Sequence, residues 1–250
     1  MLTFNDLSVA FAMPDGEKFR ALGPIDLTIE PGQFVCIVGP SGCGKSTLIK
    51  VVAGLQKATQ GSVVLGDVPI KSPSPRVGLM FQEANLMPWR TVRDNVALSL
   101  ELAGVKREAR YAVVEEMLGV LGLQEFADAY PGGLSGGMAQ RVALGRVLSQ
   151  KPEVLLLDEP FGALDAMTRE QISLDLMAAW RRNKQTALMV THDINEAVLL
   201  SDRILVLSRR PGRVIADITV DLPRPRQPEI TFTPEFGAFA RAVREAINAG

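Results

Sequence analysis

The sequence predicts an α/β fold: a mostly parallel sheet core, an N-terminal antiparallel β subdomain and an inserted helical subdomain. Three observations predict it. Short apolar runs recur with helical stretches between them, an alternating pattern opens the chain, and the strand signal disappears in the middle. The chain has 250 residues, of which 47% are hydrophobic. It is therefore long enough to form a core without disulfides or structural metal.

The first element is the alternating segment, residues 2–29. Polar and apolar residues alternate there more than elsewhere, and the segment is punctuated by Pro14-Asp15-Gly16 and Gly23-Pro24. Glycine and proline at such places are typical of tight turns between paired strands. We therefore expect antiparallel hairpins.

The strands of the core are expected where apolar residues run without interruption. Strands buried on both faces lack alternation, and this is the pattern of a parallel sheet covered by helices. The runs occupy residues 34–38, 77–80, 154–157, 187–190 and 204–207.

Helices are expected between about residues 92 and 148, where apolar stripes with charged remainders replace the strand signal, as in residues 110–118. We interpret this stretch as the helical subdomain. Near the C-terminus, Pro223, Pro225 and Pro228 interrupt regular structure, and residues 236–243 are then suited to an amphipathic helix. We expect one domain over 1–250, with the Pro-rich segment and terminal helix at about 221–248.

Composition and charge exclude several classes of protein. Lys and Arg number 27 against 28 Asp and Glu, a net charge of −1, so no polybasic field indicates binding to nucleic acid or an anionic membrane. No apolar run reaches the roughly 18 residues of a membrane span, and the N-terminus lacks a signal-peptide pattern. Cys36 and Cys43 match no zinc spacing and suggest a reducing compartment. We expect a soluble intracellular protein whose membrane partner, if it has one, is another chain.

A phosphate-binding loop follows the run at 34–38. The segment fits G-x-x-x-x-G-K-[ST] and precedes a helical run at 47–52, which is the context that this motif needs. Glycines let the backbone N–H groups wrap around phosphate oxygens, and the helix adds the positive end of its dipole. Lys45 is expected along the terminal phosphates, and the Ser46 hydroxyl on Mg²⁺. Cys43 is read as a small loop residue, with an acidic thiol as the alternative. The loop comprises Gly39, Pro40, Ser41, Gly42, Cys43, Gly44, Lys45, Ser46 and Thr47.

Two further segments carry polar groups suited to ATP hydrolysis. The run at 154–157 ends in Asp158 and Glu159, where parallel strands meet their ligands. Asp158 is then expected near Mg²⁺, and Glu159 is suited to polarise a water for attack on the terminal phosphate. Ser135, Gly136 and Gly137 precede another helical run and form a second anion-binding helix start, although each segment alone would also fit a simple helix cap or turn.

The order of these motifs resembles the nucleotide-binding subunit of an ABC transporter, a P-loop NTPase, over nearly the whole chain. The corresponding segments are Walker A (39–47), the Q-loop Phe81-Gln82-Glu83, the signature Leu134-Ser135-Gly136-Gly137-Met138, Walker B ending at Asp158-Glu159, the D-loop Ala163-Leu164-Asp165 and the switch histidine His192.

The resemblance implies how these residues act. Two subunits pair head to tail around two ATP molecules, each held by Walker A of one chain and Ser135, Gly136 and Gly137 of the other. Glu159, His192 and Gln82 take part in catalysis, and Ser46, Gln82 and Asp158 hold Mg²⁺. Gln82 also couples the nucleotide to the membrane partner, and Asp165 communicates across the dimer. Phe11 stacks on adenine, with Phe19 as a weaker candidate.

A narrower resemblance is to importer subunits of the nitrate, sulfonate and taurine type. Within it, Trp89 is also compatible with a core position, and the run Arg210-Pro211-Gly212-Arg213 with a hairpin turn of solvated charge. Ala139 and Gly145 depart from the pattern, and the glycine costs about 1 kcal/mol of helix stability relative to alanine. The matching segments are 85–96, 193–198, 208–214 and 221–226.

We therefore expect an ATP-hydrolysing subunit, with ATP and Mg²⁺ as cofactors, that energises import of a small anion or sulfonate-like solute. It would form a homodimer on membrane-spanning permease subunits at the cytoplasmic face of the cell membrane, served indirectly by an external solute-binding protein, with no nucleic acid. The alternative is a soluble ABC-type switch acting on nucleic acid or ribosomes. An exporter is disfavoured, and a GTPase is rejected because Thr186 replaces the aspartate of Asn-Lys-x-Asp in Asn183-Lys184-Gln185-Thr186.

Overall fold

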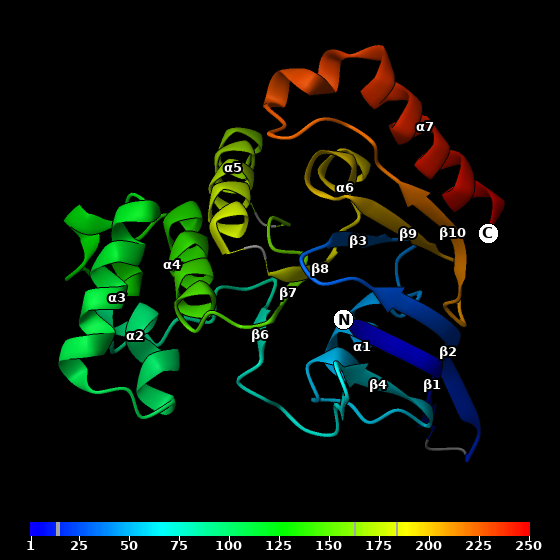
Figure 1. Cartoon of the computed structure of the whole chain (residues 1–250), viewed down its shortest axis with the longest axis horizontal. Coiled ribbons are helices and arrows are strands. Elements are labelled where there is room, and N and C mark those ends of the chain that lie inside the picture. Colours follow the sequence, from blue (N-terminus) through cyan, green and yellow to red (C-terminus); the bar gives the residue numbers. More distant parts are fainter. Residues whose placement is uncertain (14–15, 163, 184) are drawn as a thin grey trace. The chain divides into compact units, whose positions relative to one another are not determined.

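The computed structural model describes residues 1–13, 16–162, 164–183 and 185–250 (Figure 1). The chain divides into two compact units. The first contains residues 1–77 and 186–250, and the second contains residues 78–185. Within the described ranges, no helix is both long enough and apolar enough to cross a membrane.

The first unit contains most of the strands. They are β1 (Leu2–Ala12), β2 (Lys18–Ile29), β3 (Phe34–Val38), β4 (Gln60–Leu65), β5 (Val68–Pro69), β8 (Thr186–Val190), β9 (Arg203–Leu207) and β10 (Val214–Thr219). Its helices are α1 (Lys45–Val52), α6 (Ile194–Leu200) and α7 (Pro234–Ala249), with a 3₁₀ turn over Pro228–Phe232.

An antiparallel sheet of strand order β2-β1-β4-β5 forms the N-terminal part of this unit. In β1 the apolar side chains Leu2, Phe4, Leu7 and Val9 are buried, and a register shift between Phe4 and Leu7, where Asp6 has φ 45°, separates the two alternating pairs. The hairpins predicted over residues 2–29 are therefore confirmed. The tip residues Pro14 and Asp15 lie outside the described residues.

The core strands β8, β3 and β9 lie side by side and parallel. Every residue of β3 and β8 is buried, as expected for strands covered on both faces. β10 pairs antiparallel with β9 at the edge. The strands predicted at residues 34–38, 187–190 and 204–207 are thus confirmed.

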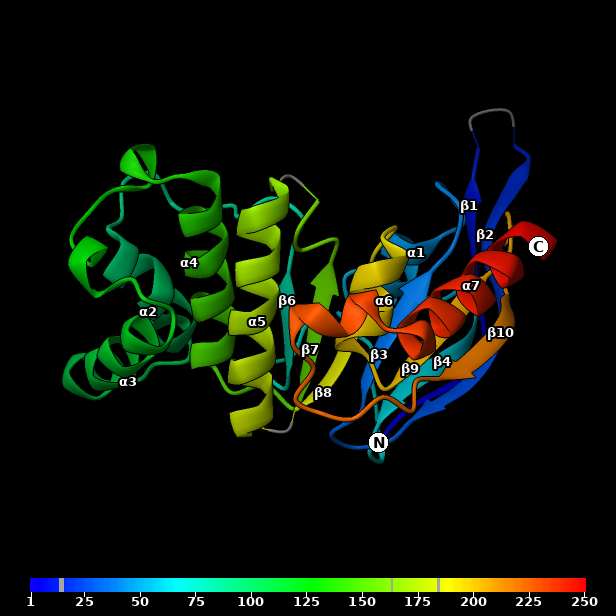
Figure 2. The ribbon, with the colours of Figure 1, turned by 90° about the horizontal axis from the view of Figure 1, so that it is seen from above.

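The C-terminal segment covers α6. Helix α7 packs against α6, β9 and β10 and buries Phe236 and Val243 (Figure 2). Its first turn is capped by the Thr233 hydroxyl, which accepts a hydrogen bond from Phe236 N. The predicted terminal helix is confirmed and begins two residues earlier than the sequence suggested.

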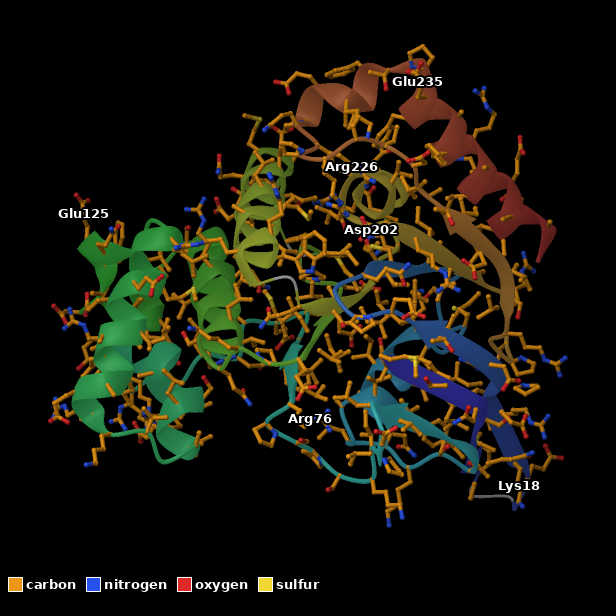
Figure 3. All side chains as sticks on the ribbon, viewed as in Figure 1. Lys18, Arg76, Glu125, Asp202, Arg226 and Glu235 are labelled. Carbon is orange, nitrogen blue, oxygen red and sulfur yellow. The ribbon has the colours of Figure 1, made fainter. Side chains whose placement is uncertain are left out.

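Arg226 fastens this segment to the end of α6. Its guanidinium is buried and donates to the carbonyls of Val198 (2.8 Å), Ser201 (2.6 Å) and Val220 (3.0 Å). Burial lowers the pKa of Arg226 to about 10, so the group stays charged at neutral pH. Asp202, beside it in Figure 3, accepts from Arg224 Nε at 2.8 Å and from the Phe34 N–H at 2.9 Å. The proline-rich stretch therefore supplies a cap for the last carbonyls of α6.

The second unit is mostly helical. Ser135, Gln140 and Gly145 lie on or next to its central helix, which packs against three others (Figure 2). Its elements are β6 (Val77–Met80, which starts at the boundary), α2 (Val92–Leu102), α3 (Arg107–Val120), 3₁₀ turns at Gln124–Phe126 and Pro131–Gly133, the central helix α4 (Gly136–Ser149), β7 (Val154–Asp158) and α5 (Ala166–Asn183). The strands predicted at 77–80 and 154–157 and the helices predicted between 92 and 148 are confirmed.

Gly145 allows α4 to approach its neighbours closely. A Cβ at this position would lie 2.8 Å from Leu121 Cδ1 and 3.4 Å from both Met117 Cγ and Val96 Cγ2. The glycine that departs from the sequence pattern therefore has a packing reason, because α2 and α3 occupy the space of a side chain.

Candidate functional site

The phosphate loop in the first unit connects β3 to α1. Gly44 immediately precedes the helix with φ 109°, a left-handed conformation that favours glycine. A Cβ there would lie 2.5 Å from Leu22 Cδ2 and 2.9 Å from the Ala21 carbonyl. The loop geometry thus requires glycine, and the first N–H groups of α1, which have no partner inside the helix, end the loop.

Lys45 folds back across this loop. Its side chain is buried, and Nζ donates to the carbonyls of Gly39 at 2.9 Å and Pro40 at 3.1 Å. An ammonium group away from water is costly unless hydrogen-bonded and paired with negative charge. The two carbonyls satisfy part of that need and leave the charge suited to an anion in the loop.

The remaining loop residues divide by exposure. Ser41 and Ser46 are exposed, whereas Cys43 is buried. Burial raises the pKa of the Cys43 thiol, although the neighbouring Lys45 acts in the opposite direction. The thiol is therefore neutral at physiological pH, which favours the interpretation of Cys43 as a small loop residue. Ser46 lies in the first turn of α1.

His192 reaches the same sheet edge as the loop. The parallel register of β8 with β3 pairs Val190 with Ile37, and Thr191 N continues it by donating to Ile37 O at 3.2 Å. His192 follows and is exposed. Asp193 then caps α6, accepting from Asn195 N at 2.8 Å. The sheet thus brings His192 and the phosphate loop to one edge.

The two aromatic candidates for adenine stacking are cross-strand partners. Phe11 in β1 pairs with Phe19 in β2. Phe11 is 37% exposed. The face of the Phe19 ring is covered by the Arg210 guanidinium, whose Cζ lies 4.2 Å from the ring centroid. Of the two rings, Phe11 is the more accessible.

In the second unit, Gln82 and Glu159 converge on Gly162. A Cβ on Gly162 would lie 3.3 Å from Gln82 Nε2 and 3.7 Å from Glu159 Oε2. Asp158 is the last residue of β7, and Glu159 follows with φ 47°, an uncommon backbone conformation for glutamate. Strained residues of this kind concentrate at functional sites, which makes Glu159 a candidate on backbone grounds as well.

The signature segment starts α4. The Ser135 hydroxyl accepts from Met138 N at 3.2 Å, so Ser135 is the N-cap of a 14-residue helix. Gly136 is exposed, and its nearest neighbour for an added Cβ is Leu164 Cδ2 at 3.9 Å. Gly137 is buried against Thr168, where a Cβ would clash. The exposed helix start presents N–H groups and a positive dipole end.

Gln140 is a residue that sequence reasoning missed. It is buried in α4, and its Nε2 donates to the Gln82 carbonyl at 2.7 Å. The signature helix therefore holds the main chain of the Q-loop. The available signal was its place two residues after the signature segment.

Other sequence interpretations have mixed outcomes. Trp89 is 71% exposed, so its alternative interpretation as a core residue is wrong. In the D-loop, Ala163 lies outside the described residues, as does Lys184 in the rejected guanine motif. Asp165 accepts from Thr168, and this hydrogen bonding lowers the pKa of the Asp165 carboxyl.

The donor set is compatible with Mg²⁺ bound mainly through nucleotide phosphates. Ser46, Gln82 and Asp158 offer a hydroxyl, an amide and a carboxylate oxygen, the hard donors that this ion prefers. Among the described residues, no group of three or more His, Cys, Asp or Glu side chains is arranged to hold a metal by itself. Magnesium sites completed by substrate phosphates need few protein ligands.

A glycine loop between a parallel strand and a helix, with a buried lysine as the first residue of that helix, defines a nucleotide-binding protein of the P-loop class. Residues 22–162 match the family model described as ABC transporter. The chain belongs to the ABC transporter family and is an ABC-type ATPase that binds ATP.

Relatives of known sequence extend this match along the chain. A putative ATP-binding protein of Brucella abortus is 47% identical over 246 residues, covering 98% of this chain and 93% of that protein. The nitrate import ATP-binding protein of Synechococcus elongatus is 44% identical over 239 residues, covering 94% of this chain and 36% of that protein. The bicarbonate transport ATP-binding protein of the same species is 48% identical over 226 residues, covering 89% of this chain and 34% of that protein. This chain therefore spans about a third of the length of the nitrate and bicarbonate proteins.

A solved structure shows the same fold. It is the dimeric post-hydrolysis state of an ATP-binding cassette bound to ADP and Pi, with a TM-score of 0.77 and 33% identity. The match covers 89% of this chain and 100% of that one. The α/β fold with an antiparallel N-terminal sheet and a helical part is thereby established.

Proposed function

We propose that this chain is the ATP-hydrolysing subunit of an importer for a small anion or sulfonate-like solute. In this role residues 1–250 form one nucleotide-binding domain, held peripherally at the cytoplasmic face of the cell membrane by permease subunits. An external solute-binding protein delivers the solute. The relatives named for nitrate and bicarbonate support an anionic solute, since both are small oxyanions.

Lys45 is the observation that carries the proposal. Its buried ammonium group is hydrogen-bonded by two carbonyls at the mouth of a loop that ends in a helix N-terminus. A β,γ-phosphate pair supplies the negative charge that such a site needs. Gly39, Pro40, Ser41, Gly42, Cys43, Gly44, Ser46 and Thr47 complete the cradle, and Phe11 offers its exposed ring to adenine.

The hydrolytic roles are assigned to polar side chains. Glu159 orients the attacking water and accepts its proton, and His192 donates to the terminal phosphate. Ser46, Asp158 and Gln82 would hold Mg²⁺, which neutralises phosphate charge when bound. Gln82 also transmits the state of the nucleotide to the permease, and its link to Gln140 ties that signal to α4.

A homodimer explains the second anion-binding helix start. The N-terminus of α4 with Ser135, Gly136 and Gly137 would contact the nucleotide held by the partner chain. The similar ATP-binding cassette of known structure was solved as a dimer with ADP and Pi, which supports this arrangement. Each nucleotide would then lie between a lysine loop and a signature helix of different chains.

Co-purification from the native cell tests the importer. Tagged Glu159→Gln chain is expressed, membranes are solubilised with Mg-ATP, and the bound proteins are identified, with Glu125→Gln as the control. We expect a polytopic membrane protein in stoichiometric yield. Recovery with ribosomes or nucleic acid would instead establish the soluble switch and contradict the proposal.

The recovered complex then identifies the solute class. Reconstituted in liposomes with its binding protein, it is assayed for ATP-dependent uptake of labelled nitrate, bicarbonate, taurine and a neutral sugar. Uptake of one of the anionic or sulfonate solutes is expected, and transport of the sugar alone would overturn this part of the proposal.

A further inference from the structure

The turn between β9 and β10 reaches the phosphate loop. Arg210 in this turn donates from Nε to the Gly42 carbonyl at 3.0 Å. The guanidinium packs directly on Gly42, because a Cβ added there would lie 3.1 Å from Arg210 Nη2. The guanidinium also lies over the Phe19 ring, with Cζ 4.2 Å from the ring centroid. One side chain thus joins the phosphate loop to the β1–β2 hairpin, and sequence analysis had interpreted its charge only as solvated.

The backbone of this turn is locked in place. Gly212 N donates to Ala21 O and Gly23 N donates to Gly212 O, both at 3.0 Å. A Cβ on Gly212 would lie 2.1 Å from the Cys43 carbonyl, so only glycine allows this approach. Figure 1 shows the hairpin and the β9–β10 end of the sheet side by side. Arg210 is therefore presented to the loop by a rigid support rather than by a free surface segment.

Arg210 is exposed and carries its charge beside the phosphate loop. In the described part of the chain, no salt bridge includes Arg210, whose contacts are the Gly42 carbonyl and the Phe19 ring. Arginine has further N–H donors and stays protonated at any physiological pH. A positive charge that is hydrogen-bonded to the Gly42 carbonyl thus lies beside the phosphate loop. Its attraction for an incoming anion is weakened, but not abolished, by solvent.

The neighbouring Arg209 provides a comparison within the same turn. Arg209 is exposed, and its backbone carbonyl accepts a hydrogen bond from the Ser208 hydroxyl. Both residues carry the same charge at nearly the same place. They differ in that only Arg210 contacts the loop and the aromatic ring.

We propose that Arg210 is a positioning residue of the nucleotide site. Its guanidinium holds the phosphate loop through the Gly42 carbonyl and packs on the Phe19 ring. This inference rests on the proposed ATP site and adds a residue to it. The base-stacking role is thereby left to Phe11, and the loop is braced at the Gly42 carbonyl. Bracing lowers the entropy that the loop loses when it closes on a ligand.

The first test compares binding of Mg-ATP and Mg-tripolyphosphate to full-length variants by calorimetry. Arg210→Ala is expected to raise both dissociation constants by about three- to fivefold, the effect of one exposed hydrogen bond from a charged group. The substitution should weaken binding of the two ligands equally, because Arg210 contacts the phosphate loop and not the base. Arg209→Ala, with the same loss of charge, should stay within about twofold of the unchanged protein.

The second test separates positioning from general stability. KM for ATP should rise in Arg210→Ala while kcat and the melting temperature change little, and Arg210→Lys should restore only part of the affinity because it lacks the planar fork. Phe19→Leu should produce a smaller loss that is not additive with Arg210→Ala.

Two results would overturn the inference. One is equal binding by Arg210→Ala and Arg209→Ala, and the other is a loss for ATP that is absent for tripolyphosphate. Either result leaves the proposed ATPase intact provided that Lys45→Ala still abolishes tight binding. Failure of the unchanged protein to bind ATP in a Lys45-dependent manner would instead reject the proposed site itself.

Discussion

Lys45 places a positive charge inside the phosphate loop, where two carbonyls hold it across the site of the ligand. Lys45→Ala removes the only side-chain cation that the motif directs at the phosphates. We expect a loss of at least about 2 kcal/mol of binding free energy, or roughly 30-fold in Kd for Mg-ATP, by calorimetry. Lys50→Ala, an exposed position in the last turn of the same helix, is the charge-matched control. Equal affinity in the two variants would count against the loop as the binding site.

Glu159 combines a carboxylate with a left-handed backbone after β7. Glu159→Gln keeps the shape of the side chain but removes its basicity. We expect turnover to fall by about 10²- to 10⁴-fold, the usual contribution of a general base, with little change in Kd for Mg-ATP. Steady-state phosphate release and calorimetry measure the two quantities. Normal hydrolysis would remove Glu159 from this role, and Glu125→Gln, an exposed site in the same unit, should behave as the unchanged protein.

Cys36 and Cys43 are both buried, and burial raises the pKa of each thiol above its ordinary value of 9.0. Neither thiol should react with a maleimide at pH 7.5 in the native protein, and both should react after unfolding. The same shift predicts lower stability at alkaline pH. Above about pH 9 the unfolded thiols lose protons while the folded ones keep them, so the free energy of unfolding falls as pH rises. Denaturant titrations at pH 7 and pH 9.5 measure this, and Cys36→Ala should reduce the difference.

At the scale of elements, helix α4 shows how packing overrides helix propensity. Gly145→Ala gains about 1 kcal/mol of propensity but inserts a methyl 2.8 Å from Leu121 Cδ1. Overpacking of this kind costs about 1–3 kcal/mol, so we expect a net loss of about 1 kcal/mol in denaturant unfolding. The control is Gly237→Ala in α7, where nothing outside the adjacent backbone of the helix lies within 4 Å of the added Cβ, and there stability should rise. A gain at both positions would show that Leu121 moves aside at no cost.

The elements that sequence patterns located best are the apolar ones. β3 and β8 consist of apolar or β-branched residues throughout, and burial on both faces leaves no other interpretation. β4, β5 and β10 were not predicted from the sequence. β5 and β10 are edge strands, of which β5 is short and β10 is half-exposed, and β4 alternates only weakly. Their pairing depends on partners distant in sequence.

At the scale of the whole molecule, motifs placed the reactive groups better than they placed the contacts between them. The loop at Gly39 to Thr47 and the acids after β7 are recognisable because local chemistry dictates their spacing. Gln140 and Arg210 were not recognised as site residues. Each donates to a backbone carbonyl far along the chain, at Gln82 and Gly42 respectively, and although Gln140 lies close to the signature segment, no local pattern identifies the partner of either residue.

The proposed dimer makes a prediction that a site within one chain does not. Gly136→Asp fits sterically and suits a helix start, yet places a negative charge where the signature helix would meet phosphate. Alone, Lys45→Ala and Gly136→Asp chains should each be nearly inactive. Mixed in equal amounts with the permease complex, they form heterodimers in which one of two sites is intact, since its Lys45 and its Gly136 come from different chains. ATPase activity should then recover to about a quarter of the unmutated level, because about half of the dimers are mixed. If each site instead used Lys45 and Gly136 of the same chain, every site would carry one defect and mixing would restore nothing. Both variants should keep the melting temperature of the unmutated protein, so that the recovered activity reports the pairing of chains.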